Sequence, residues 1–454
     1  MLILISAGEA SGEMYGAQLI EALRRATEHV GTDAFVRPAG RSPAPAGAST
    51  DSAELRSART GQRPVPTQTG QPGAAVPTFF GVGGDRMRAA GCDTVVDAKD
   101  LAVVGITEIV SHLPKILGLY KHLIREADRR KPDLAIVIDS PAFNWRVARQ
   151  MKKRGIPTVY YVAPQFWAWR QGRVRLIRDY IDKALVIFPF EEKFYRDRGV
   201  DATFVGHPLA DLPNPTIRRE DYAEQFNLDP KKNWITLMPG SRVKEVRMNL
   251  PTILEAAVLI GSGYEFLLPV APTLDRGFVL RLIDSAAPQA LKRGSHVDAS
   301  AARVNSCPSR ADLVGRINLV PESLPALFHS RAGIIASGTA TVEAAMMNLP
   351  FVMVYRVSPL TYLLGKPRVK VPRFAMVNLI AGEEIVPELV QHDFTAANLV
   401  KKLNEVLPDG PARERMLEGL ARVRTRLRGP AGSSGVAQHP ADRAAEIILG
   451  LLRL

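Results

Sequence analysis

Short apolar runs rich in β-branched residues recur along this chain, and amphipathic helical patterns lie between many of them, as at Glu13–His29. Because strands covered on both faces are continuously apolar, this alternation predicts parallel β-sheets with helices on either side. The runs form two series that meet near Pro208–Thr216, so we expect two doubly wound α/β domains facing each other across a cleft. Ligands of such sheets bind beyond the carboxyl ends of the strands. The expected strands are Leu2–Ser6, Leu134–Ile138, Thr158–Val162, Ala184–Phe188, Ile235–Met238, Glu265–Val270, Gly333–Ala336 and Phe351–Val354.

Three segments contain few large apolar side chains, and we expect each to lie at the surface. Val36–Thr78 is dominated by Pro, Gly, Ala, Ser and Thr, and it cannot bury enough apolar surface to offset the entropy of ordering, so we expect a disordered insertion. The predicted organisation is a first domain at 1–209 with the insertion at 36–78, a second domain at 210–428 with an insertion at about 288–313, and a linker and closing helix at 429–454.

The charge balance favours anionic partners. Lys and Arg number 59 against 46 Asp and Glu, which gives a formal charge of +13, and such a surplus suits nucleotides, phosphorylated substrates, nucleic acid or an acidic membrane surface. The two cysteines, Cys92 and Cys307, indicate neither a disulfide framework nor a cysteine-based zinc site. The first residues lack the basic region of a signal peptide, and no run approaches the roughly 18 apolar residues of a membrane-spanning helix. We therefore expect a soluble or peripheral protein.

Two strand-to-helix turns in the first half could carry chemistry. SAGEASGE, at Ser6–Glu13, includes Glu9 and Ser11; it could bind an anion at the start of the next helix or be a plain turn. It is not the GxGxxG pattern, so a dinucleotide cofactor is poorly supported. LAIVIDSPAFN places Asp139 at the carboxyl end of a buried strand, where a carboxylate is costly unless it is paired or takes part in a reaction. Asp139 could be a general base or the N-cap of the next helix.

An aromatic and basic cluster follows at Tyr160–Asp179. Trp167 and Trp169 are close in sequence to Arg170 and further arginines. Aromatic faces beside a basic rim can hold a sugar ring or an acyl chain next to a phosphate, although the same residues could form a corner of the core. His207, between Gly and Pro, could be a base but is more often structural in such a context.

The second half offers groups suited to a diphosphate. Arg242, in ITLMPGSRVKEV, follows a strand, and arginine can contact phosphate through two N–H groups at once. The segment IIASGTATVEAA predicts a strand-to-helix turn whose N–H groups and helix dipole could hold a diphosphate. The residues of that turn are Ser337, Gly338, Thr339 and Thr341.

Two further polar residues of the second half could each have one of two roles. Glu343 could accept hydrogen bonds from a ribose or stabilise the start of its helix, and Asn378 could be a cleft group or a helix cap. We find no DxD pair, no HExxH and no GxxxxGK[ST] in the sequence. These absences favour a metal-independent transfer without a cofactor and argue against a P-loop NTPase.

In this collinear order the motifs resemble those of lipid-A-disaccharide synthases, glycosyltransferases of the type called GT-B, which has two Rossmann-like domains. The resemblance covers nearly the whole chain outside the insertions, and the number of motifs in order makes it specific. The motifs are SAGEASGE, GVGGDRM, VVGITEIV, IDSPAFN, PQFWAWRQGRV, FPFE, FVGHPL, MPGSRVKEV, SGTATVE, VYR and NLIAGEEIVPELVQ.

The resemblance implies a reaction and a set of site residues. UDP-2,3-diacylglucosamine would be the donor and 2,3-diacylglucosamine 1-phosphate the acceptor, whose 6-hydroxyl attacks with inversion to give a β-1,6-linked disaccharide and UDP. By resemblance Asp139 is the base. The implied donor-binding residues are Arg242, Ser337, Gly338, Thr339, Thr341, Glu343 and Asn378. Those expected near the acceptor or the donor sugar are Glu9, Ser11 and Trp167.

The acyl chains of both implied substrates come from a membrane. Val103–Ile124 is apolar beyond one narrow stripe and is flanked by basic residues such as Lys115, Lys121 and Arg125. We hypothesise that this segment contacts the inner leaflet, where basic residues would meet anionic lipid; an ordinary buried helix is the alternative. The expected location is the cytoplasm, peripheral on the inner face of the cytoplasmic membrane.

Two other functions remain open at this stage. Another GT-B transferase or epimerase of cell-envelope synthesis that uses UDP-GlcNAc would turn over a non-acylated sugar equally well. A nucleic-acid-binding protein is suggested by charge alone, and no aromatic and basic groove of the RNA-binding type stands out, so we expect no nucleic acid partner.

Overall fold

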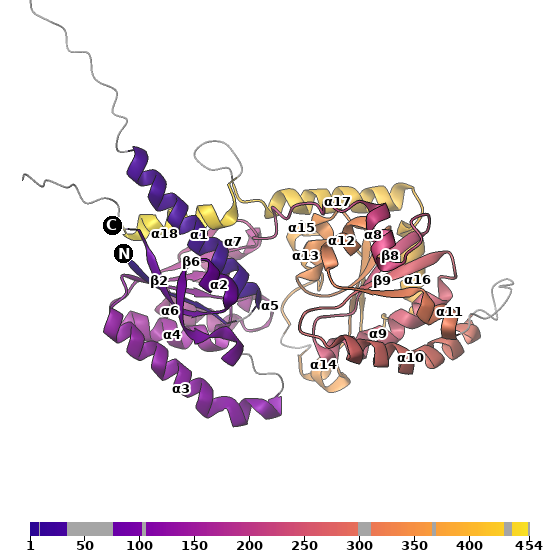
Figure 1. Cartoon of the computed structure of the whole chain (residues 1–454), viewed down its shortest axis with the longest axis horizontal. Helices are drawn as coiled ribbons and strands as arrows, with labels where there is room; N and C mark the ends of the chain where they lie inside the picture. The colour runs from indigo at the N-terminus through magenta and orange to yellow at the C-terminus, as the bar shows by residue number, and fades with distance from the viewer. Residues whose placement is uncertain are drawn as a thin grey trace, which may run out of the picture.

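Two parallel β-sheets, each in its own lobe, form the computed structural model, which describes residues 1–8, 10–33, 76–101, 106–297, 310–365, 369–430 and 438–452 (Figure 1). The first sheet has the order β3-β2-β1-β4-β5-β6-β7 and the second the order β10-β9-β8-β11-β12-β13. The strand order of each sheet reverses once, between β1 and β4 and between β8 and β11. The doubly wound architecture expected from the alternating pattern is therefore confirmed.

The strands of the first sheet lie between residues 2 and 204, and those of the second between 233 and 390. Those of the first are β1 (Leu2–Ala7), β2 (Thr78–Gly83), β3 (Cys92–Asp97), β4 (Leu134–Ile138), β5 (Thr158–Tyr161), β6 (Lys183–Val186) and β7 (Ala202–Phe204). Those of the second are β8 (Asn233–Met238), β9 (Tyr264–Pro269), β10 (Ile317–Val320), β11 (Ala332–Ala336), β12 (Phe351–Tyr355) and β13 (Glu388–Val390). All eight expected strands are present, and the domain bounds themselves stay a prediction.

Helices connect the strands and cover the sheets (Figure 1). In the first half they are α1 (Ala10–Asp33), α2 (Asp85–Ala89), α3 (Ile106–Arg130), α4 (Pro141–Lys153), α5 (Phe166–Trp169), α6 (Val174–Tyr180) and α7 (Pro189–Arg196). The second half adds α8 (Arg219–Phe226), α9 (Val243–Leu259), α10 (Arg276–Val297), α11 (Arg310–Gly315), α12 (Ser323–His329), α13 (Ala340–Met346), α14 (Pro359–Gly365), α15 (Met376–Ala381), α16 (Ala396–Val406), α17 (Pro411–Leu427) and α18 (Pro440–Leu452). None of these described helices is both long and apolar enough to cross a lipid bilayer.

The sheets are buried on both faces, as their continuous apolar runs predict. On β4, Leu134, Ile136 and Ile138 pack into one core cluster, whereas Ala135 and Val137 pack into the cluster on the opposite face. All five side chains are fully buried. Because successive side chains of a strand point to opposite faces, a strand with no polar position must have helices on both sides.

The expected insertions differ in part from what is observed. Most of the segment 36–78 lies outside the described residues, but Thr78 begins β2, and its N–H donates to the carbonyl of Met1 at 3.0 Å. Residues 288–297 continue α10 and residues 310–313 begin α11, so the described ends of the second expected insertion are helical, and the insertion itself stays a prediction. Gln, Ala, Leu, Lys and Arg follow Pro288, and these residues favour a helix without needing to be large and apolar.

Two connections between the lobes cross in backbone contact. The N–H of His207 donates to the carbonyl of Leu427 at 2.8 Å, so the chain leaving β7 runs against the chain leaving α17. A Cβ on Gly206 would lie 2.7 Å from the nitrogen of Gly429, and a Cβ on Gly429 would lie 2.7 Å from the carbonyl oxygen of Val205. Only glycine fits at either position. After this crossing α18 returns to pack beside α1 of the first lobe (Figure 1).

Candidate active site

The reversal points of the two sheets coincide with the motifs selected from the sequence. At the first, β1 leads into Gly8 and β4 into Asp139. At the second, β8 leads into the turn before Arg242, and β11 leads into Ser337. A crevice at the carboxyl ends of the strands at such a point is where open α/β sheets bind their ligands. Each lobe therefore brings two of the selected motifs to one edge.

Asp139 lies in a turn whose backbone is held by its neighbours. Asp139 and Ser140 have φ of 48° and 44°, a left-handed conformation that non-glycine residues seldom adopt. The carbonyl oxygen of Asp139 accepts hydrogen bonds from Asn144 Nδ2 at 2.8 Å and from the Tyr160 hydroxyl at 2.7 Å. Asn144 is itself buried, and its Oδ1 accepts a hydrogen bond from Ser6 at 2.8 Å. Strain held in this way by surrounding structure is typical of functional sites.

The N-cap reading of Asp139 is wrong. Helix α4 begins at Pro141, and its N-cap position is Ser140, whose side chain makes no capping hydrogen bond. Pro at the first position of the helix needs no such partner, because it has no N–H.

The glycines of SAGEASGE bring α1 close to the Asp139 turn. A Cβ on Gly8 would lie 2.6 Å from Ser140 Oγ, so no larger residue fits there. A Cβ on Gly12 would lie 3.6 Å from Asp139 Cβ, which is ordinary contact. The first turn of α1 therefore lies directly against the predicted base.

Tyr15, one helical turn after Gly12, is a site residue that the sequence reasoning missed. Its side chain is only 4% exposed. Burial, followed by the negative charges of Asp139 and Glu343, raises the pKa of the Tyr15 phenol to about 12. One phenol of the first lobe thus lies within electrostatic reach of the predicted base and of a glutamate of the second lobe. Its spacing from Gly12 was the only signal in the sequence, and any buried helix residue shows the same spacing.

The remaining residues of SAGEASGE have different environments. Glu9 lies outside the described residues, and Ser11 is exposed on the first turn of α1. Glu13 accepts a hydrogen bond from the N–H of Arg86 at 2.7 Å, and a Cβ on Gly84 would lie 2.6 Å from its carboxylate. The sequence motifs SAGEASGE and GVGGDRM therefore pack against each other, and Glu13 caps the short helix α2.

Trp167 is buried and bonded to the protein itself. Its indole Nε1 donates to Glu191 Oε1 at 2.8 Å, and its ring packs edge-to-face on Phe190 at 4.9 Å. The other Glu191 oxygen accepts the N–H groups of Ile187 and Phe188 at 3.1 and 3.0 Å. Burial raises the pKa of Glu191 to about 7, although these hydrogen bonds act in the opposite direction.

The loop that contains Trp167 also meets the second lobe. The carbonyl of Ala168 accepts a hydrogen bond from the N–H of Lys370 at 2.9 Å. Trp169 is 49% exposed, and the guanidinium of Arg170 lies over its ring at 3.8 Å from the centroid. Of the two tryptophans, Trp169 is the one with an accessible face.

His207 is fully buried, and burial lowers its pKa to about 3. Its Nδ1 accepts a hydrogen bond from the N–H of Leu209 at 3.1 Å. The ring is therefore neutral at physiological pH and braces the linker, which fits the structural interpretation.

In the second lobe, Arg242 precedes α9 and exposes 78% of its side chain. Its guanidinium contacts Glu245 at 3.2 Å. Glu245 Oε2 also accepts the N–H groups of Ser241 and Arg242, at 3.1 and 3.3 Å. The carboxylate of Glu245 thus binds the free N–H groups at the start of α9. The exposed guanidinium of Arg242 is the group that remains available to a ligand.

The turn after β11 is more open than the turn after β4. Gly338 has φ of 143°, and a Cβ there would meet nothing within 4 Å. Gly338 and Thr339 are exposed, whereas Thr341 is buried and donates its hydroxyl to the carbonyl of Gly338 at 2.8 Å. Ser337 donates its hydroxyl to the carbonyl of Phe374 at 2.8 Å.

Glu343 lies one turn into α13, and its negative charge contributes to the raised pKa of Tyr15. Burial raises the pKa of its carboxyl group, while a hydrogen bond from the Ser323 hydroxyl at 2.9 Å acts in the opposite direction. Ser323 was not selected from the sequence, because a single serine at a helix start carries no distinctive pattern.

Asn378 is fully buried, and its amide is saturated by the protein. Oδ1 accepts the N–H groups of Ile385 and Val386, and Nδ2 donates to the Val386 carbonyl and to Glu388. Glu388 in turn accepts the N–H of Phe374 at 2.8 Å. The carbonyl of Phe374 accepts a hydrogen bond from the Ser337 hydroxyl. Asn378 therefore supports the open turn indirectly, through Glu388 and Phe374.

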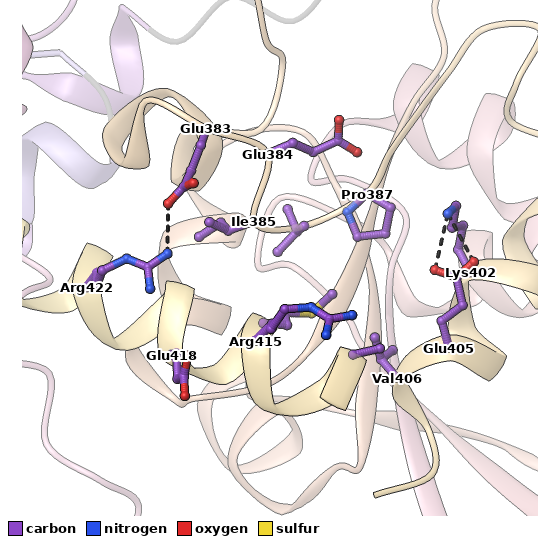
Figure 2. Close-up of a pocket in the computed structure, with 13 residues that line it drawn as sticks. Glu383, Glu384, Ile385, Pro387, Lys402, Glu405, Val406, Arg415, Glu418 and Arg422 are labelled. Carbon is purple, nitrogen blue, oxygen red and sulfur yellow. Dashed lines mark hydrogen bonds and ion pairs between the residues drawn. The ribbon is translucent and has the colours of Figure 1, made fainter. Parts of the chain in front are cut away.

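A well-defined cavity lies away from the strand ends that carry the selected motifs. It measures about 460 Å³ and is lined by α16, α17 and the segment that leads into β13 (Figure 2). Within it Arg422 pairs with Glu383 at 2.7 Å and Lys402 with Glu405 at 3.0 Å. It is at the amino end of β13, so it does not belong to the edge that carries the selected motifs.

Comparisons with known proteins agree with the motifs. Residues 71–421 match the family model described as lipid-A-disaccharide synthetase. The lipid-A-disaccharide synthase of Koribacter versatilis is 44% identical over 449 residues, which is 99% of this chain and 98% of that protein. That of Acidobacterium capsulatum is 45% identical over 439 residues, or 96% of this chain and 94% of that protein.

Solved structures share the fold at low sequence identity. The UDP-GlcNAc 2-epimerase of Neisseria meningitidis bound to UDP-GlcNAc has a TM-score of 0.53 at 10% identity, with all of both chains covered. A calicheamicin glycosyltransferase has a TM-score of 0.52 at 14% identity, covering 100% of this chain and 98% of that one. With its two sheets in the GT-B arrangement and its near full-length matches, this chain belongs to the lipid-A-disaccharide synthase family.

Proposed function

We propose that this protein joins UDP-2,3-diacylglucosamine to 2,3-diacylglucosamine 1-phosphate, forming the β-1,6-linked disaccharide 1-phosphate of lipid A and releasing UDP. Two observations carry the proposal. In each lobe the family's motifs lie at the reversal point of the sheet, and the chain matches the family over nearly its whole length. The proposed reaction is metal-independent and inverts the anomeric carbon.

Asp139 is the proposed general base. As the 6-hydroxyl oxygen of the acceptor forms its bond to the anomeric carbon, the carboxylate of Asp139 accepts the hydroxyl proton, and the bond from that carbon to the diphosphate breaks. The fixed turn around Asp139 supports this role, because Asn144 and Tyr160 hold its backbone carbonyl and so limit the reorganisation of the turn during the reaction.

The second lobe is the proposed donor site. Arg242 would contact the diphosphate, whose negative charge grows as UDP leaves, and the exposed turn of Gly338 and Thr339 would present N–H groups to it. Glu343 would accept hydrogen bonds from the ribose hydroxyls of the donor. For Asn378 we propose a positioning role, since its amide is already saturated.

On the acceptor side, Ser11 and Glu9 are proposed to meet the acceptor or the donor sugar at the start of α1. Trp167 would act by shaping its loop, because its indole N–H is bonded to Glu191. The exposed ring of the neighbouring Trp169 is the surface that a sugar or an acyl chain could contact.

We further propose that α3 docks on the inner face of the cytoplasmic membrane. Leu113 and Leu117 are one helical turn apart and are 58% and 48% exposed, whereas Leu123 near the other end is fully buried. Lys121 and Arg125 belong to the same helix and could meet anionic headgroups. Residues 102–105 lie outside the described residues, and the side chains of 106–112 do as well.

The docking proposal is tested with vesicles that contain anionic lipid. Changing Leu113 and Leu117 together to Lys should release most of the protein into the supernatant after sedimentation, while circular dichroism shows an intact fold. Leu280→Lys, at a residue of α10 that is 45% exposed, is the matched control and should sediment like the wild type. Equal sedimentation of both variants, or unfolding of the double variant, would contradict docking through α3.

The reaction is tested by measuring UDP release from UDP-2,3-diacylglucosamine in EDTA, with and without 2,3-diacylglucosamine 1-phosphate. Release that depends on the acceptor and survives the chelator supports the proposal. UDP-GlcNAc with a non-acylated acceptor is the comparison reaction, and equal turnover of it would point to a different transferase. Release only when a divalent metal is added would contradict metal independence.

A further inference from the structure

A second cavity, at the opposite edge of the second sheet from the proposed donor site, has an unusual set of charges. It measures about 320 Å³ and lies where β8 and β11 begin, next to the first turn of α8. Figure 1 shows α8 close to β8 in the second lobe. The lining residues are Arg219, Pro230, Lys231, Lys232, Asn233, Trp234, His329, Ser330, Arg331 and Arg413.

Five of these lining residues are Lys or Arg, and none is Asp or Glu. The cavity of Figure 2 provides the contrast, because four glutamates there face three basic residues. In the basic cavity, the ion pairs among the described residues supply two carboxylates from outside the lining. Asp409 contacts Arg331 and lies 3.9 Å from Arg413, and Glu265 lies 3.4 Å from Lys232.

Arg219 is the most firmly held of these cations. Three of its N–H groups donate to backbone carbonyls, those of Pro230 at 3.1 Å, Lys232 at 2.7 Å and His329, and its guanidinium lies 3.6 Å from the centroid of Trp234. A guanidinium has five N–H donors, so two remain for a ligand. The hydrogen-bond partners of Arg219 are neutral carbonyls that hold it in a fixed orientation; burial lowers its pKa, and the charges of Glu220 and Glu265 act in the opposite direction.

A neighbouring guanidinium is held in the same manner. Arg413 donates to the carbonyls of Arg331 and Val406, both at 2.9 Å. Burial and then the charge of Arg331 lower the pKa of Arg413, whereas Asp409 acts in the opposite direction. Half-buried cations that repel each other raise the free energy of the empty cavity, and a bound anion would offset that repulsion.

Among the residues that the structure describes, Lys231 has no ion-pair partner, and it is exposed at the rim. It can therefore turn toward a ligand without breaking a contact. Fixed guanidinium groups with one adjustable ammonium suit an oxyanion, since guanidinium geometry matches two oxygens and an ammonium acts as a point charge.

We propose that this cavity binds an oxyanion of the phosphate type, separately from the sugar-nucleotide cleft. It is located at the amino ends of β8 and β11, whereas Arg242 and Gly338 follow their carboxyl ends. Binding at this edge would stabilise the second lobe without contacting either proposed substrate.

The test is calorimetric titration of the intact chain with inorganic phosphate at fixed ionic strength. Lys231→Glu should weaken phosphate binding at least tenfold without loss of folding, because the residue is exposed and unpaired. Lys401→Glu makes the same change of charge on an exposed face of α16 and should leave the affinity unchanged. Arg242→Ala should also leave it unchanged, which separates this cavity from the donor site.

Three results would overturn the proposal: no phosphate binding by the wild type, wild-type affinity in Lys231→Glu, or an equal loss in Lys401→Glu. A competition arm identifies the source of the oxyanion. Vesicles containing phosphatidylglycerol that displace phosphate from the wild type support the site with a lipid headgroup as its ligand. Binding that such vesicles leave unchanged supports it with a free phosphate compound.

Discussion

The turns after β4 and β11 occupy equivalent places in two sheets of the same strand order, yet they are built differently. The first is fixed from outside, by Asn144 and Tyr160, around a strained aspartate. The second is fixed by Thr341 on the carbonyl of Gly338 and by Ser337 on the carbonyl of Phe374, and it leaves Gly338 and Thr339 exposed. A rigid carboxylate suits proton transfer, and an open backbone suits contact with an anion. The comparison predicts that changes at the first turn affect turnover and changes at the second affect donor affinity.

The largest effect is expected at the first turn. Asp139→Asn should lower turnover about 10²–10⁴-fold, because an amide cannot accept the proton. UDP affinity, measured by calorimetry, should stay within about twofold of the wild type, since Asp139 and Arg242 belong to different lobes. Turnover close to that of the wild type would remove Asp139 as the base, and an equal loss of UDP affinity would break the division between the two turns.

A second effect concerns the support of the first lobe through Glu191. Its pKa is about 7 in the folded protein against 4.5 for an ordinary glutamate, so the folded state holds the extra proton between these values. The contribution of Glu191 to stability should therefore be complete below pH 4.5 and be lost as the pH rises to 7, by about 3 kcal/mol.

Glu191→Gln should flatten that part of the profile of unfolding free energy against pH, measured by urea denaturation. Glu192→Gln, at the adjacent and more exposed position of α7, is the control and should keep the wild-type slope. Identical slopes in the wild type and in Glu191→Gln would mean that Glu191 does not titrate in this range.

On the donor side, in the turn after β8 that lies beside the second turn in the strand order, Arg242→Ala should weaken UDP binding about 10–100-fold, the range for loss of a hydrogen bond to a charged group. The effect on the chemical step at saturating donor should be smaller. Lys244→Ala removes a nearby exposed cation and should change affinity little. If both variants lose affinity equally, Arg242 contributes only through general electrostatic attraction.

The smallest effect on turnover is expected at Tyr15, whose pKa is raised by the charges of both Asp139 and Glu343. Tyr15→Phe should lower turnover about 3–10-fold, as expected for one neutral hydrogen bond, because its phenol lies near both Asp139 and Glu343. Tyr180→Phe, on α6, is the control. Unchanged turnover in Tyr15→Phe would mean that the two turns act independently of this residue.

The sequence predicted the longer strands well and the short or polar ones poorly. All eight expected strands are present because they are buried runs of apolar residues, and Leu134–Ile138 has the expected bounds. Five observed strands were not among the eight: β7 and β13, which have three residues each, β10, which has four, β3, which carries Asp93 and Asp97, and β2, which includes Gly81 and Gly83. Strands this short or this polar do not differ from loops in local pattern, and their pairing depends on residues far along the chain.

For the site, the sequence located the turns but could not separate ligand-facing groups from supporting ones. Asn378 and Trp167 stand in motifs as distinctive as that of Asp139, yet their polar atoms bond Val386, Glu388 and Glu191. Which partner satisfies a polar side chain depends on tertiary contacts. Tyr15 was missed for the same reason, since its burial and its closeness to the charges of Asp139 and Glu343 arise from tertiary contacts.

The course of α1 has a practical consequence for labelling the protein. The helix runs from the carboxyl end of β1 back to the amino end of β2, so the chain leaves α1 at Asp33 and rejoins at Val76 on the edge opposite Asp139 (Figure 1). A fluorophore, affinity tag or surface anchor attached at Val76, which is 61% exposed, would leave the protein at that edge. The protein could then be immobilised there with the substrate edge left accessible.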